Sequence, residues 1–89
     1  MQYFDFPYRS SDVIGLETAR GYVFEVTNAL GHAPDDIIIY QEFNYPLGSD
    51  RWTFYGRRKT PSGRPPRYYP FQAEVLFGER IEVHFNYGH

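Results

Sequence analysis

The most prominent chemistry in this sequence is a run of basic side chains that contains no carboxylate. Six of the nine basic residues belong to it: Arg51, Arg57, Arg58, Lys59, Arg64 and Arg67. The rest of the chain holds all eleven acidic residues, so a net charge of −2 conceals a segment of +6 within a body of −8. Guanidinium and ammonium groups form charge-assisted hydrogen bonds with carboxylates and phosphates. The segment from Arg51 to Arg67 therefore predicts a contact surface for an anionic partner.

Aromatic side chains stand on both sides of this basic run. Tyr, Trp and Arg are enriched at the energetically dominant positions of protein interfaces, and aromatic rings also stack on nucleobases. We therefore expect segment 51–69 to contain a partner-binding surface. Its basic and aromatic residues are Arg51, Trp52, Tyr55, Arg57, Arg58, Lys59, Arg64, Arg67, Tyr68 and Tyr69.

Three interpretations of this surface remain open. The first is a non-catalytic inhibitor or accessory protein that docks on the acidic surface of a larger protein, for example a nucleic-acid-processing one. The second is a nucleic-acid-binding module, although the acidic body would repel a long phosphate backbone. The third is a solvated segment that keeps a sheet edge soluble. A small, acidic, cysteine-free and tyrosine-rich chain resembles in format the immunity-type and phage anti-defence-type inhibitors, which favours the first.

An enzymatic alternative is a small metal-independent ribonuclease. In such an enzyme His or Tyr transfers the proton, while Arg or Lys stabilises the charge on the phosphate. The residues of those types are Arg57, Arg58, Lys59, Arg67, Tyr69 and His84. No catalytic motif supports this reading, so we expect no enzymatic activity. The spacing of His32, His84 and His89 matches no metal signature, and we expect neither a metal nor a cofactor.

The bulk composition sets the remaining limits. Eighty-nine residues are expected to form one domain, 1–89. The absence of cysteine excludes disulfides and thiolate metal sites, as is common in a reducing cytosol. The N-terminus lacks the features of a signal peptide, and the apolar runs are too short to span a membrane. We therefore expect a cytoplasmic protein without a membrane partner.

One helix is predicted, at about 18–30. Apolar residues recur there with the period of a single buried stripe: Ala19, Tyr22, Val23, Val26, Ala29 and Leu30. Thr18 is placed to cap the N-terminus, and Gly31 is placed for a left-handed stop at the C-terminus.

Strands are predicted on both sides of this helix. Residues 2–8 indicate a short strand that Pro7 confines to an edge. Residues 37–43 begin with three isoleucines, which favour a central strand buried on both faces. Residues 51–57 form the next strand, and the Pro-, Gly- and Arg-rich residues 58–66 form a protruding basic loop.

The last two strands can be placed in register. Placing Phe77 opposite Ile81 and Val75 opposite Val83 keeps every pair apolar, with residues 78–80 as the loop. The resulting fold class is α+β: an antiparallel sheet of about four to five strands with one α-helix packed on one face, in the order β-α-β-β-β-β.

Overall fold

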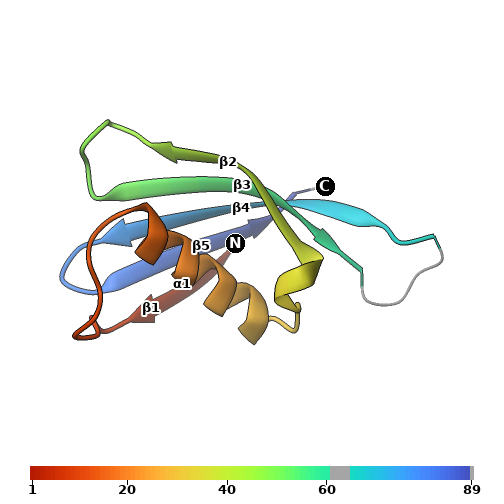
Figure 1. Cartoon of the computed structure of the whole chain (residues 1–89), viewed down its shortest axis with the longest axis horizontal. Coiled ribbons are helices and arrows are strands. Elements are labelled where there is room, and N and C mark those ends of the chain that lie inside the picture. Colours follow the sequence, from red (N-terminus) through yellow and green to blue (C-terminus); the bar gives the residue numbers. More distant parts are fainter. Residues whose placement is uncertain (61–64, 89) are drawn as a thin grey trace.

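The computed structural model describes residues 1–60 and 65–88 and shows one helix packed on an antiparallel sheet of five strands (Figure 1). Strands pair in the order β1-β5-β4-β3-β2. The predicted α+β fold is therefore confirmed. The elements are β1 (Gln2–Phe6), α1 (Leu16–Ala29), the short 3-10 helix η1 (Pro34–Asp36), β2 (Ile37–Asn44), β3 (Arg51–Lys59), β4 (Tyr68–Phe77) and β5 (Ile81–Tyr87).

Helix α1 begins two residues earlier than predicted. It ends just before Gly31, which the sequence analysis identified as the stop signal. Gly15 is the N-cap and no side chain caps this terminus, so the prediction for Thr18 was wrong. At the other end Gly31 has φ of 94°, which glycine adopts without strain. The N–H of Gly31 donates to the carbonyl of Asn28 and that of His32 to the carbonyl of Thr27. These two bonds form a Schellman cap, which fixes His32 directly behind the helix.

The predicted register of the last hairpin is confirmed. Phe77 lies opposite Ile81 and Val75 opposite Val83, and residues 78–80 connect the strands. The apolar set of this hairpin packs beneath α1, where Val23 and Val26 are fully buried. Alternation with period two thus places one face of the sheet in the core. No helix in the described residues is long and apolar enough to cross a membrane.

Strand β2 is an edge strand, so its predicted central position was wrong. Ile37 is buried and Ile39 packs against the core, whereas Ile38 points to the other face and is half exposed. Three consecutive β-branched residues favour extended backbone, but they do not determine how many strands flank it. A bulge between Ile39 and Gln41 interrupts the pairing of β2 with β3.

Strand β3 continues through Lys59, two residues beyond the predicted end. Arg58 and Lys59 therefore belong to the strand and not to the predicted loop 58–66, of which residues 61–64 lie outside the described part of the chain. Side chains of β3 alternate between the two faces, since Trp52 and Phe54 contact the core while Thr53 and Tyr55 lie on the other face. Strand β1 forms the opposite edge, as predicted, and ends before Pro7.

Candidate functional site

The sheet face that points away from α1 is the candidate site, and we call it the open face. Its side chains come from alternate positions of all five strands, and in the described residues no helix covers it. Its members include Tyr3, Ile38, Tyr40, Phe43, Thr53, Tyr55, Arg57, Tyr68, Gln72, Glu74, His84 and Asn86. The face has an aromatic and basic part over β2, β3 and β4 and a polar part over β4, β5 and β1.

The aromatic part contains a hollow of about 370 Å³ lined by Ile38, Tyr40, Arg57 and Tyr68, which we call the Arg57 hollow. The guanidinium carbon of Arg57 lies 5.5 Å from the ring centroid of Tyr40, within the range of a cation–π contact. Tyr40 and Tyr68 are 51% and 48% exposed. Arg57 thus contacts the Tyr40 ring and is itself exposed, so its guanidinium donors are accessible to a partner.

Arg57 makes no salt bridge within residues 1–60 and 65–88. Outside the basic segment every arginine is paired: Arg9 with Glu25, Arg20 with Glu17 and Glu42, and Arg80 with Asp5. In the segment Arg51 approaches Glu74 at 3.9 Å. Among the described residues no carboxylate lies within ion-pair distance of Arg57, Arg58, Lys59 or Arg67. The β3–β4 hairpin therefore carries concentrated positive charge that no carboxylate of residues 1–60 and 65–88 neutralises, apart from the long Arg51–Glu74 contact.

Arg58 occupies a different environment from its neighbour Arg57. Because successive side chains alternate across a strand, Arg58 points to the helix side of the sheet. Its guanidinium carbon lies 4.4 Å from the ring centroid of Tyr87 and 5.1 Å from that of Tyr69. The cation contacts both rings, and its Nε is buried without a hydrogen-bond partner in the described residues. Arg58 therefore contributes to packing at this end of the sheet.

His32 completes the cluster around Tyr87. It is 9% exposed, and its Nε2 lies 3.1 Å from the Tyr87 hydroxyl. Burial, and then the charge of Arg58, lower the pKa of His32, and the charge of Asp36 opposes this only in part. Sequence reasoning missed this contact, because Gly31 marks the end of the helix but gives no indication of a partner 55 residues away.

This lowered pKa predicts how stability depends on pH. The unfolded chain binds a proton on His32 as the pH falls through about 6.5, whereas the folded protein resists protonation until a lower pH. The unfolded state therefore binds more protons in this window, and the free energy of unfolding decreases as the pH falls. We expect urea denaturation to show lower stability at pH 5.5 than at pH 7.5.

The control for this prediction is the variant His32→Gln. It should flatten the pH dependence of stability below pH 7, because the shifted group is gone. An equal slope in the wild type and His32→Gln would contradict the assignment to His32.

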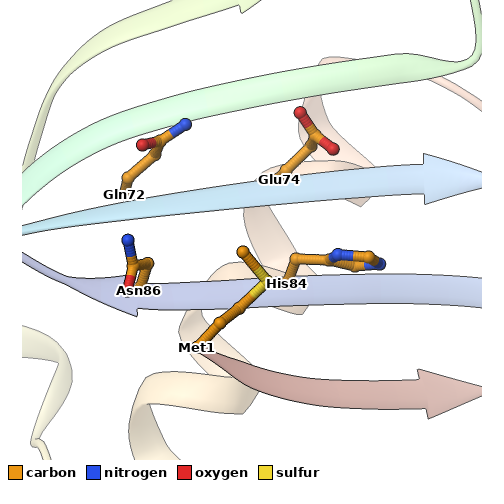
Figure 2. A pocket seen from close by; sticks show the side chains of 5 residues that line it. All are labelled: Met1, Gln72, Glu74, His84 and Asn86. Atoms are coloured by element: carbon orange, nitrogen blue, oxygen red, sulfur yellow. The ribbon is translucent and has the colours of Figure 1, made fainter.

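The polar part of the open face contains a smaller pocket of about 80 Å³ (Figure 2). Gln72 and Glu74 enter it from β4, His84 and Asn86 from β5, and Met1 lies beside them. Glu74 lies directly opposite His84 in the register.

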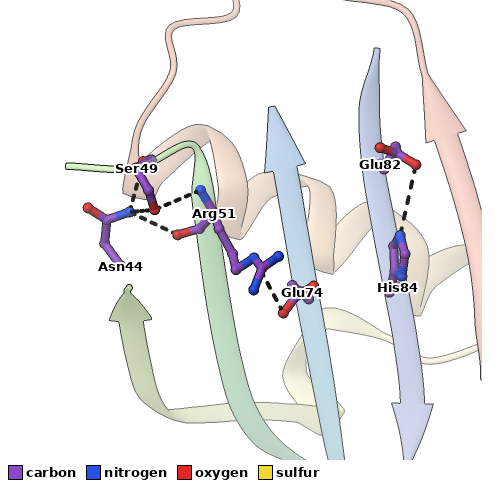
Figure 3. Close-up of polar contacts among 6 residues, drawn as sticks. All are labelled: Asn44, Ser49, Arg51, Glu74, Glu82 and His84. Atoms are coloured by element: carbon purple, nitrogen blue, oxygen red, sulfur yellow. Dashed lines mark hydrogen bonds and ion pairs between the residues drawn. The ribbon is translucent and has the colours of Figure 1, made fainter. Parts of the chain in front are cut away.

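Glu74 and His84, which line this pocket, each make one long side-chain contact (Figure 3). Arg51 Nε lies 3.9 Å from Glu74 Oε2, and His84 Nε2 lies 3.9 Å from Glu82 Oε1. Both distances exceed that of a hydrogen bond. Both pairs are also partly exposed, so each contributes little to stability.

The structure divides the residue set of the ribonuclease alternative between two faces. Arg57 and His84 lie on the open face, on strands separated by β4, whereas Arg58 and Tyr69 lie on the helix side. General acid–base cleavage needs the proton-transfer group and the phosphate-binding groups around one point. No three His, Asp or Glu side chains within residues 1–60 and 65–88 are grouped to hold a metal ion.

The predicted binding residues are likewise divided. Those on the open face are Arg51, Tyr55, Arg57, Lys59 and Tyr68, and those on the helix side are Trp52, Arg58 and Tyr69. Arg67 is exposed where the β3–β4 loop joins β4, and its carbonyl there accepts the N–H of Thr60; Arg64 lies outside the described residues. The predicted binding residues did not include Ile38, Tyr40 and Phe43, because residues 37–43 were expected to be buried on both faces of the sheet.

Comparison with known proteins yields no relative for this chain. No protein-family model matches it, and neither the curated proteins nor the solved structures give a significant match.

Proposed function

We propose that this protein is a non-catalytic binding protein that docks on an acidic surface of a larger protein through the Arg57 hollow. The observation that carries the proposal is an arginine without a carboxylate partner in the described residues, set among half-exposed aromatic rings. Arg and Tyr dominate binding energy at interfaces because they combine large contact area with directed hydrogen bonds. An acidic side chain of the partner supplies the missing counter-charge.

The exposed apolar side chains around the hollow support a protein partner. Phe43 and Ile38 are half exposed on the same face as Tyr40, and such apolar groups on one face are typical of an interaction site. The acidic remainder of the chain favours a compact protein over a long polyphosphate. The finer proposal is a small cytoplasmic inhibitor or accessory protein of the immunity or phage anti-defence type, acting on a nucleic-acid-processing protein.

The test is affinity capture with two variants of equal charge change. Immobilised wild-type protein, Arg57→Glu and Arg80→Glu are exposed to extract from the cells that produce the protein. Arg80 makes its contact with Asp5 at the other side of the open face. We expect a captured protein to be retained by Arg80→Glu and lost from Arg57→Glu, because a repulsive charge at an interface costs several kcal/mol. Capture that is equal for all three proteins would contradict the proposal.

A nucleic-acid target is the second candidate, because Tyr40 and Tyr68 present rings beside Arg57. Bases stack on such rings while cations contact phosphates. Fluorescence anisotropy with a labelled single-stranded RNA separates the two candidates. Saturable RNA binding that weakens steeply as salt rises would favour nucleic acid, since phosphate contacts release counterions. The same RNA, recovered intact or cleaved after incubation, also tests the ribonuclease alternative.

A further inference from the structure

The two edges of the sheet differ in how well they are protected from further strand pairing. β1 has five residues, is followed by Pro7, and is tied to its surroundings by the Asp5–Arg80 and Tyr3–Glu82 contacts. β2 has eight residues and contains no Lys, Arg or Pro. Lysine, proline and short length are the usual means of blocking an edge strand. β2 therefore has none of these three features, and its bulge is the one irregularity in its pairing with β3.

The side chains of β2 extend the Arg57 hollow to this edge. Ile38 and Tyr40 line the hollow, and Phe43 is exposed farther along the same face. Arg57 belongs to β3, and its guanidinium carbon lies 5.5 Å from the ring centroid of Tyr40 on β2. A strand added to β2 would lie about 4.8 Å beyond it. A Glu side chain on that strand could then reach Arg57.

We propose that β2 accepts an extended segment of the partner protein as a sixth strand, with acidic side chains of that segment turned to the open face against Arg57. Backbone hydrogen bonds to the free edge supply affinity, and the Arg57 hollow supplies selectivity for acidic residues. This inference rests on the proposed function, because it specifies how the acidic partner binds.

A second copy of this chain fits the edge less well than an acidic segment. Each copy would bring its own Arg57, and Lys59 lies opposite Tyr68 on the same face, so cations without counter-ions would meet at the interface. Like charges at an interface oppose association. β2 offers Glu42 as its acidic side chain, and that carboxylate is already paired with Arg20 on α1.

The test uses synthetic peptides in place of the unidentified partner. A ten-residue peptide alternating Val and Glu is titrated into the ¹⁵N-labelled protein, and hydrogen exchange of backbone amides is followed by NMR. We expect slower exchange for amides of residues 37–44 that do not pair with β3. Binding of a Val–Lys peptide should be about tenfold weaker or undetectable, because its charges repel Arg57. A Val–Glu peptide with prolines in place of three valines should lose the protection, because proline cannot pair in a strand.

Two protein variants complete the experiment. Ile38→Glu places a carboxylate beside Arg57 on the open face, where it repels the Glu side chains of the peptide, and should abolish peptide binding. Val13→Glu makes the same change at an exposed position outside the sheet and should leave binding unchanged.

Three results would overturn strand addition. The first is the absence of peptide effects at millimolar concentration. The second is peptide binding on the open face without protection of β2 amides, which would leave the proposed function intact. The third is protection of β2 that rises with protein concentration alone, which would identify a second copy of the chain as the occupant.

Discussion

Replacing Gly56 with alanine should destabilise the fold by about 3 kcal/mol or more, because the new methyl group has no room. A Cβ at this position would lie 2.5 Å from the carbonyl oxygen of Ile38 and 2.5 Å from the Phe71 ring. The first contact is with backbone of the neighbouring strand, which cannot rotate away. Phe71 is itself buried against Phe85, with ring centroids 5.1 Å apart. Relief of the clash therefore requires either a shift of β2 or repacking of the core.

The matched control is the same substitution at Gly21. This glycine lies on the exposed side of α1, and a Cβ there would meet no atom within 4 Å. Alanine is favoured over glycine in a helix by about 1 kcal/mol, so Gly21→Ala should stabilise the protein. Chemical denaturation followed by circular dichroism measures both variants. Equal effects at the two sites would show that Gly56 is not sterically confined.

Phe85→Ala should destabilise the protein by about 3–5 kcal/mol, because it leaves a cavity at the centre of the core. The Phe85 side chain is fully buried and contacts both Phe71 and Tyr87. For a domain of this size the corresponding loss in Tm exceeds about 12 °C. The free energy of unfolding of a typical domain is only about 5–15 kcal/mol. The substitution removes a large share of it, so we expect partial unfolding at room temperature.

Phe43→Ala provides the comparison for this second prediction. Phe43 is 45% exposed on the open face. Its truncation should change the free energy of unfolding by less than about 1 kcal/mol, because surface substitutions usually have small effects. Thermal unfolding of the two variants tests the pair. Similar melting temperatures for Phe43→Ala and Phe85→Ala would mean that the open face, and not the helix side, holds the core.

The fold was largely predictable because local patterns determine it. The alternation in β4 and β5 allowed one apolar register, and the structure has that register. The end of α1 followed from Gly31, whose positive φ is a backbone requirement visible in the sequence. The position of β2 was not predictable in the same way. Whether a strand is central or at an edge depends on which other strands reach it, and this is a long-range property.

The candidate site was predictable in composition and not in geometry. The basic segment was evident from the sequence. Because Arg58 was expected to lie in a loop, its contacts with Tyr69 and Tyr87 were not predicted. The rings that hold it come from β4 and β5, and only the register of three strands brings them together. The contribution of Tyr40 was hidden because residues 37–43 were expected to be buried on both faces, whereas in the described residues no helix covers the open face.

The positive charge of the β3–β4 hairpin also makes the charge distribution of the molecule asymmetric. The chain measures 42 × 24 × 21 Å, and the β3–β4 hairpin projects at one end of its longest axis (Figure 1). The loops at the opposite end, residues 7–15, 45–50 and 78–80, carry three carboxylates and two basic side chains, so they lack the excess of positive charge found on the hairpin. Such a separation of charge creates an electric dipole along the long axis, so an anionic partner's field rotates the molecule hairpin-first before contact. Because this field is screened beyond about 8 Å at physiological ionic strength, the orientation acts during the last few ångströms of approach and fades as salt is added.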